Sequence, residues 1–118
     1  MSYKVILILF FTVLHNAVFS ANNWITLNSG TNNMLVYVDF FDSNTGLVIG
    51  SPGTVLRTEN AGKTWDKIDI GMSVNLSTVN FVTKDLVFIS GDNGLILKSI
   101  DSGKTWDTMT TNVSTMLY

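Results

Sequence analysis

Three tryptophans, Trp24, Trp65 and Trp106, recur at a fixed spacing of 41 residues. The second and third each end the tetrapeptide Gly-Lys-Thr-Trp, at residues 62–65 and 103–106, and an ungapped overlay of the two repeats gives eleven identities. A fixed period near 40 residues is typical of stacked structural units, each leaving an apolar face that its neighbour covers. The pattern therefore predicts a repeat protein, and it specifies an architecture rather than a reaction.

The N-terminus has the pattern of a secretory signal peptide. Lys4 precedes a run over residues 5–14 that is apolar except for Thr12, and the stretch Val18-Phe19-Ser20-Ala21 follows. A run of this length is shorter than the roughly 20 residues that a membrane-spanning helix needs. We expect cleavage after Ser20 and a secreted or periplasmic protein. The alternative is an uncleaved signal segment, which would be the chain's only link to a membrane.

Composition narrows the chemistry of the expected mature chain, residues 21–118. It has no cysteine, and the single histidine, His15, lies in the signal segment. Sites for zinc, haem and most forms of copper are thereby excluded, and we expect no cofactor. Nine carboxylates against six basic groups give a net charge of −3, with Arg57 the only arginine. Nucleic acid is therefore not an expected partner, because it requires clustered Lys and Arg.

Each repeat contains short runs of Val, Ile, Leu and Phe separated by Gly, Asn, Asp or Ser, which are strand and turn signals. No segment after residue 21 shows a helical period, so we expect an all-β chain. Four short antiparallel strands in about 40 residues match one blade of a β-propeller. The expected strands are residues 35–41, 46–49, 54–58 and 64–68 in the first repeat and 77–82, 86–90, 95–99 and 105–109 in the second.

Residues 99–106 match the Asp-box pattern Ser/Thr-x-Asp-x-Gly-x-Thr-Trp at every defined position, and residues 58–65 match it with Asn60 in place of Asp. Asn can still accept backbone hydrogen bonds in such a turn. The motif residues of the first repeat are Thr58, Asn60, Gly62, Thr64 and Trp65, and those of the second are Ser99, Asp101, Gly103, Thr105 and Trp106.

With the preceding Phe40 or Phe81 and a Gly-x-x-Gly turn, residues 22–118 resemble the photosystem II stability and assembly factor family of Asp-box (BNR-like) β-propellers. The resemblance implies two four-stranded blades, about residues 35–68 and 77–109, and a structural role for the Asp-box residues. It also implies an extracytoplasmic scaffold that binds a protein partner. In that family the partner-binding surface is rich in arginine, whereas this chain has only Arg57.

The number of blades departs from the family pattern, because a closed propeller needs roughly four to eight. Residues 24–27 have the pattern of the outer strand of a preceding blade, and residues 116–118 that of the start of a following one. Two open blades would expose apolar faces. We therefore expect either a truncated or split family member or a homo-oligomer in which several copies complete one ring.

Catalysis finds little support in these residues. A sialidase needs an arginine cluster, which one arginine cannot supply. Asp39 and Asp42 are the candidates for the two carboxylates of another glycosidase, but neither recurs in the second repeat, so we interpret both as solvated loop acids. The sequence Asp92-Asn93-Gly94 suits a plain turn better than part of a calcium cage.

Three functional hypotheses remain. The first is an exported, non-catalytic module that binds or assembles a protein partner. The second is a carbohydrate-active or glycan-binding module that uses exposed aromatic residues such as Tyr37 or Phe41. The third is a truncated product without an independent function.

Overall fold

The computed structural model describes residues 4–8 and 23–109, which form two four-stranded antiparallel sheets and one two-stranded sheet. We call the sheet β3–β4–β5–β6 blade 1 and the sheet β7–β8–β9–β10 blade 2. The strands are β1 (Lys4–Ile8), β2 (Trp24–Asn28), β3 (Met34–Phe40), β4 (Gly46–Ser51), β5 (Thr54–Thr58), β6 (Asp66–Ile68), β7 (Leu76–Phe81), β8 (Val87–Gly91), β9 (Ile96–Ser99) and β10 (Asp107–Met109).

The all-β fold class expected from the sequence is confirmed. The eight strands of the two blades begin and end within two residues of the expected positions. Differences of two residues occur at three places: β4 ends later than expected, and β6 and β10 begin later. The later starts arise because Thr64 and Thr105 donate their backbone N–H groups to the preceding turns. The single helical element among the described residues is the 3-10 turn η1 (Asp92–Gly94), and none of their helices is long and apolar enough to cross a membrane.

Each blade is a simple meander, because its strands are hydrogen-bonded to their neighbours in chain order. Two of its features recur at the repeat spacing. The ladder between the first two strands is shifted at Leu35/Tyr37 in blade 1 and at Leu76/Thr78 in blade 2. The first strands, β3 and β7, also lie side by side. The sequence repeat is therefore a repeat of backbone geometry as well.

The main core lies between the two blades. Blade 1 contributes Leu47, Ile49 and Val55 from β4 and β5, and all three are fully buried. Side chains alternate across a strand, so these residues face blade 2 while Val48 and Leu56 face away from it. The buried residues that blade 2 contributes to the same core are Leu76, Val79, Val87, Ile89 and Leu97.

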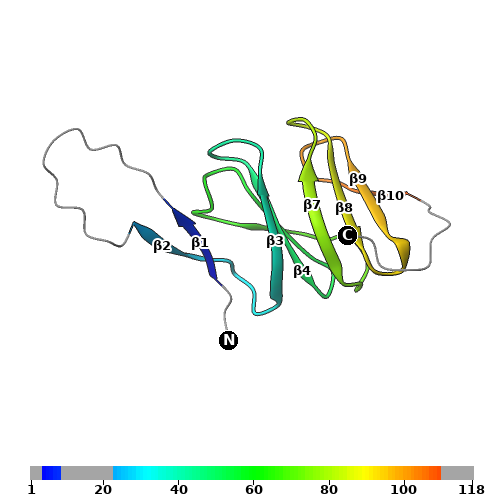
Figure 1. Ribbon diagram of the computed structural model, residues 1–118, viewed down its shortest axis with the longest axis horizontal. Coiled ribbons are helices and arrows are strands. Elements are labelled where there is room, and N and C mark those ends of the chain that lie inside the picture. Colours follow the sequence, from blue (N-terminus) through cyan, green and yellow to red (C-terminus); the bar gives the residue numbers. More distant parts are fainter. Residues whose placement is uncertain (1–3, 9–22, 110–118) are drawn as a thin grey trace, which may run out of the picture.

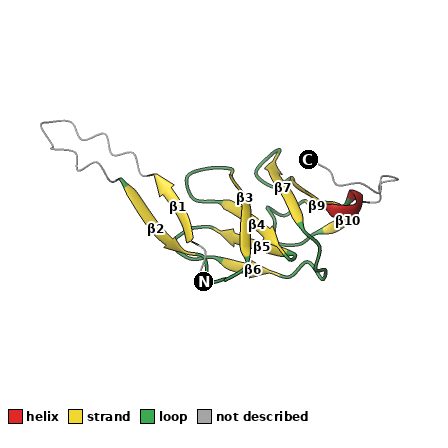
Figure 2. Cartoon of the chain, turned by 60° about the horizontal axis from the view of Figure 1, so that its bottom comes forward, coloured by secondary structure: helices red, strands yellow, loops and turns green. Residues whose placement is uncertain are grey.

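The opposite face of blade 1 has a smaller apolar cluster. Val48 and Leu56 are buried there, with Trp65 packed against them and Leu27 of β2 packed over the cluster. Strand β2 thus lies where the outer strand of a preceding blade was expected, and Figure 2 shows it at the end of the molecule beyond β3. The expected start of a following blade, residues 116–118, lies outside the described residues.

Strand β1 belongs to the segment that the sequence predicts as a signal peptide. It pairs with β2 over five residues in antiparallel register, from Lys4 opposite Asn28 to Ile8 opposite Trp24. This pairing is that of the uncleaved chain, so it does not test whether the segment is cleaved. The signal peptide and the extracytoplasmic location stay predictions.

The packing of the three repeated tryptophans differs, which gives a test of the core with an internal control. Trp106 packs against the core between the blades, whereas Trp24 is 55% exposed. We expect Trp106→Ala to lower the free energy of unfolding by about 3 kcal/mol, because truncating a large core aromatic leaves a cavity. Trp24→Ala should change it by less than about 0.5 kcal/mol. Urea denaturation followed by circular dichroism measures both, and equal losses would show that this core assignment is wrong.

Candidate functional site

The second Asp-box is a closed network of hydrogen bonds around Asp101. Its Oδ1 accepts the hydroxyl of Ser99 at 2.7 Å and the backbone N–H of Thr105 at 2.8 Å. Its Oδ2 accepts the hydroxyl of Thr105, and the Ser99 hydroxyl in turn accepts the backbone N–H of Gly103 at 2.8 Å. Both oxygens of the carboxylate are thus used to hold the turn.

The first Asp-box has the same network with a neutral side chain. Asn60 Oδ1 accepts the Thr58 hydroxyl at 2.9 Å and the Thr64 backbone N–H at 2.9 Å. Its amide nitrogen donates to the Thr64 hydroxyl at 2.8 Å, so that bond is reversed relative to the one in blade 2. Asn60 therefore replaces the carboxylate without loss of the turn, as its sequence position predicts.

Each Asp-box turn also brings its backbone close to a neighbouring sheet. Gly103 has a φ of 86°, and a Cβ added there would lie 2.8 Å from Leu47 of blade 1. Gly62 has a φ of 82°, and its added Cβ would lie 2.7 Å from Leu27. A glycine is required at both places by the left-handed backbone and by the close approach. These contacts support a structural role for the Asp-box residues.

The two tryptophans that close the turns differ in one respect. Trp106 donates its indole N–H to the carbonyl oxygen of Gly103 at 2.9 Å. The indole nitrogen of Trp65 is buried and has no hydrogen-bond partner within the described part of the chain. The ring of Trp65 instead makes an edge contact with Phe40, with 6.2 Å between the ring centroids. Blade 1 therefore lacks one hydrogen bond that blade 2 makes.

Arg57 joins blade 1 to the Asp-box turn of blade 2. Its Nε donates to the carbonyl oxygen of Ser102 at 2.7 Å, its Nη2 donates to the Ser102 hydroxyl at 3.3 Å, and its Nη1 pairs with Glu59. The guanidinium is buried, and its hydrogen bond lowers the pKa of Glu59. The only arginine of the chain is thus committed to the interface between the blades.

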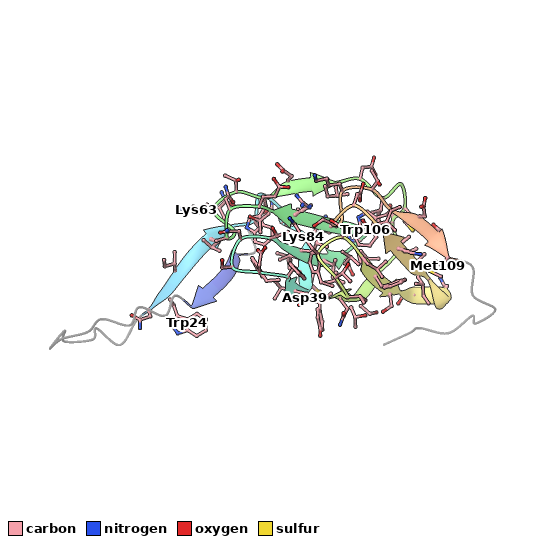
Figure 3. The ribbon with its side chains drawn as sticks, turned by 90° about the horizontal axis from the view of Figure 1, so that it is seen from above. Trp24, Asp39, Lys63, Lys84, Trp106 and Met109 are labelled. Carbon is pink, nitrogen blue, oxygen red and sulfur yellow. The ribbon has the colours of Figure 1, made fainter. Side chains whose placement is uncertain are left out.

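Asp39 also makes an inter-blade hydrogen bond, because its Oδ2 accepts the backbone N–H of Phe81 at 2.8 Å. Figure 3 shows Asp39 between the two sheets. The interpretation of Asp39 as a solvated loop acid is therefore wrong. Asp42 does lie in an exposed loop, where the backbone N–H groups of Thr45 and Asn44 donate to it and lower its pKa.

Asp39, Asp42 and Asp92 each accept hydrogen bonds from groups of this chain. Asp39 and Asp42 each bind backbone N–H groups. Asp92 accepts a hydrogen bond from the side-chain amide of Asn75 at 3.0 Å. Among the described residues, no group of three or more His, Cys, Asp or Glu side chains is placed to hold a metal ion.

Two surfaces could receive a ligand. The first is a polar groove of about 590 Å³ at the seam between the blades, near Lys84 in Figure 3. Three basic and three acidic side chains line it, so it has no single charge preference. Its lining residues are Thr45, Arg57, Glu59, Lys84, Asp85, Ile100, Asp101, Ser102 and Lys104.

The second surface, which we call the inner-strand surface, consists of Met34, Val36 and Tyr37 on β3. These three side chains are between 43% and 55% exposed. Strand β3 is the edge strand of blade 1, and Val36 lies in the register shift, where it has no residue opposite it on β4. Sheet edges in soluble proteins are usually protected by charge, Pro or covering segments. An apolar edge of this kind is typical of a protein-binding surface.

Comparisons with known proteins agree with this architecture. The family model for the photosynthesis system II assembly factor YCF48 matches residues 16–115. The chain belongs to the YCF48 family. Resemblance to photosystem II assembly factors, inferred from the Asp-box repeats, is thereby confirmed. A comparison with curated proteins gave no match.

Two solved YCF48 structures have the same fold. A structure described as YCF48 bound to D1 peptide superimposes with a TM-score of 0.71 at 22% identity, over 80% of this chain and 32% of that one. YCF48 from Cyanidioschyzon merolae gives a TM-score of 0.62 at 28% identity, over 70% of this chain and 25% of that one. The chain thus spans about a third or less of the length of these YCF48 structures.

Sequence reasoning missed the inter-blade roles of Arg57 and Asp39. The conservative replacement of Arg57 by Lys98 in the second repeat was a signal, since it keeps a basic donor at that position. The replacement of Asp39 by Asn80 likewise keeps an acceptor oxygen. Neither signal identifies the atoms to which these groups bond, because those atoms lie more than 40 positions away along the chain.

The second Asp-box contains a titratable side chain, Asp101, whereas the first has the neutral Asn60. We therefore expect the free energy of unfolding to depend on Asp101 at acid pH. Desolvation raises the pKa of Asp101, but hydrogen bonds from Thr105 and Ser99 outweigh it and lower the pKa from 3.8 to about 2. A folded-state pKa below the unfolded value contributes stability that is present above pH 3.8 and lost as the pH falls toward 2. We expect this loss to be on the order of 1 kcal/mol.

The variant Asp101→Asn should remove that part of the acid dependence, because it installs the neutral side chain that Asn60 already provides in blade 1. Free energies of unfolding from urea titrations between pH 5 and pH 2 measure it. The difference between the two proteins isolates Asp101, since Asp42 and Glu59 titrate in both. Parallel pH profiles would contradict the prediction.

Proposed function

We propose that this chain is an exported, non-catalytic protein-binding module that holds an extended polypeptide segment of its partner along the inner-strand surface. The supporting observation is the exposure of Met34, Val36 and Tyr37 on the edge strand β3. An edge strand offers main-chain hydrogen bonds to an added strand, and its exposed side chains supply selectivity. Export rests on the predicted signal peptide, and family membership supports a role in assembly rather than in catalysis.

The proposed mode of binding does not depend on arginine. Arg57 is buried and donates to Ser102 and Glu59, so most of its hydrogen-bonding capacity is used within the chain. Binding would therefore rely on apolar and aromatic contacts along β3 and on its backbone. The YCF48 structure with a bound D1 peptide shows that a member of the family binds a peptide, and this supports a polypeptide ligand here.

Peptide binding measured by fluorescence anisotropy tests this proposal. The first probes are a labelled D1 peptide and an unrelated apolar peptide of equal length. We expect Tyr37→Ser to weaken binding of whichever peptide binds by roughly tenfold, because a partly exposed aromatic anchor contributes about 1–2 kcal/mol to such interfaces.

The matched control is Ile100→Ser. Ile100 is 69% exposed but lies in the Asp-box turn of blade 2, away from β3, so its replacement should leave the affinity unchanged. Equal effects of the two substitutions, or no effect of Tyr37→Ser, would refute binding at the inner-strand surface. Failure of both peptides to bind would refute it as well.

A glycan ligand is the second candidate, supported by the exposed aromatic rings of Tyr37 and Phe41. The ring of Phe41 lies 6.1 Å from that of Phe81, which gives an aromatic pair beside the seam between the blades. A glycan array separates the two functions. Glycan binding that is lost in Phe41→Ala, together with no peptide binding, would favour the glycan.

A further inference from the structure

The outer faces of the two blades are at opposite ends of the molecule and carry complementary groups. Figure 3 places Met109, on the outer strand of blade 2, at one end and Trp24 of β2 at the other. The outer face of blade 2 has a shallow apolar groove of about 260 Å³. Its lining residues are Thr78, Asn80, Phe88, Ile89, Ser90, Ile96 and Met109.

The intrachain interface shows what one Asp-box blade needs in order to bind the next. Blade 1 supplies an acceptor from Asp39, a donor from Arg57 and an apolar side chain, Leu47, that lies over Gly103. The counterparts of these three residues lie 41 positions later in the chain, on the outer face of blade 2. There Asn80 supplies an acceptor oxygen, Lys98 a donor and Phe88 an apolar side chain.

Within the chain, blade 1 contacts three groups of blade 2, namely the Phe81 N–H, the Ser102 carbonyl and Gly103. Their counterparts 41 residues earlier are the Phe40 N–H, the Ala61 carbonyl and Gly62, which belong to the face of blade 1 opposite to blade 2. Ala61 and Ser102 have the same left-handed backbone, with φ of 61° and 65°. Each donates its N–H to the preceding loop of its own blade, to Asn44 and Asp85 respectively. The two Asp-box turns thus present their carbonyls in the same way.

Blade 1 is incompletely covered on that face. Val38 is 47% exposed, whereas its counterpart Val79, which lies against blade 1, is 1% exposed. The Trp65 indole N–H is buried without a partner among the described residues, whereas Trp106 bonds to Gly103. A buried unpaired N–H is uncommon in proteins and calls for an explanation. Leu27 of β2 covers Gly62 and Trp65 but leaves this face less well packed than the same face of blade 2.

We infer that a second copy of this chain binds head to tail, with the outer face of its blade 2 against the β2-facing side of blade 1. Phe88 of the incoming copy would take the place of Leu27 over Gly62, and Lys98 would donate to the Ala61 carbonyl. Such an interface joins two different faces, so it closes into a ring when the rotation per copy allows.

The outer face of blade 2 is less apolar than its counterpart on blade 1. Ser90 and Thr78 stand where blade 1 has Ile49 and Tyr37, and their hydroxyl groups are 2.6 Å apart. Contact between copies is therefore weaker than contact between blades within one chain, and assembly depends on concentration and competes with β2. The inference uses Val38 and Lys98, whereas the proposed function uses Tyr37, so the two can fail separately.

Sedimentation velocity of the full chain over a hundredfold range of concentration tests this inference. We expect the mass to rise with concentration to a discrete multiple, and Lys98→Glu and Val38→Glu each to hold the chain as a monomer. An equimolar mixture of the two variants should form a 1:1 heterodimer, because each retains the face that the other has lost. Assembly of either variant alone, or no recovery in the mixture, overturns head-to-tail binding.

A variant expected to strengthen assembly serves as a control, because Lys98→Glu or Val38→Glu could prevent assembly simply by unfolding the chain. Ser90→Ile restores the side chain of blade 1 at the equivalent position and should strengthen assembly about tenfold to a hundredfold. Assembly should also shift the Trp65 indole N–H resonance in NMR spectra, because the Trp65 ring lies beside Gly62, over which Phe88 of the second copy would pack. A chain that stays monomeric with Ser90→Ile overturns the inference, and so does an assembly that leaves the Trp65 signal unchanged.

Discussion

The apolar contact between the two blades is the interaction on which the rest of this structure depends. Leu47, Ile49 and Val55 meet Val79 and Ile89 in one fully buried core, to which neither sheet alone could supply both sides. An isolated four-stranded sheet leaves one apolar face in water, and repeat proteins solve this by burying each face against a neighbour. The chain is therefore organised by the contact between its repeats rather than within each of them.

The Asp-box turns help to determine how one blade is positioned against the next. Their side chains hold the hairpin between the third and fourth strands, and the left-handed residue Ser102 directs its carbonyl toward blade 1. Arg57 binds the Ser102 carbonyl in blade 2, and Gly103 allows Leu47 to approach. The motif thus acts at the interface between blades as well as in its own turn.

This geometry bears directly on function within the YCF48 family. The only arginine is used between the blades, and the carboxylates Asp39 and Asp101 bind backbone and hydroxyl donors. The apolar side chains Met34, Val36 and Tyr37 on β3 are exposed, which is why the proposed function rests on them. We assign the outer faces of the blades to contact between copies, because their polar and apolar groups match those that join the two blades within one chain.

The sequence by itself determined the repeat, the all-β class, the strand positions and the Asp-box turns. These features depend on local patterns: alternating or continuous apolar runs, glycines at turns, and a hydroxyl, an amide or carboxylate and a glycine within six residues. Only the tertiary structure decided the partners of Arg57 and Asp39, the different environments of the three tryptophans and the exposure of β3. Those properties depend on which sheet lies against which face, and residues more than 40 positions apart make the contacts that decide it.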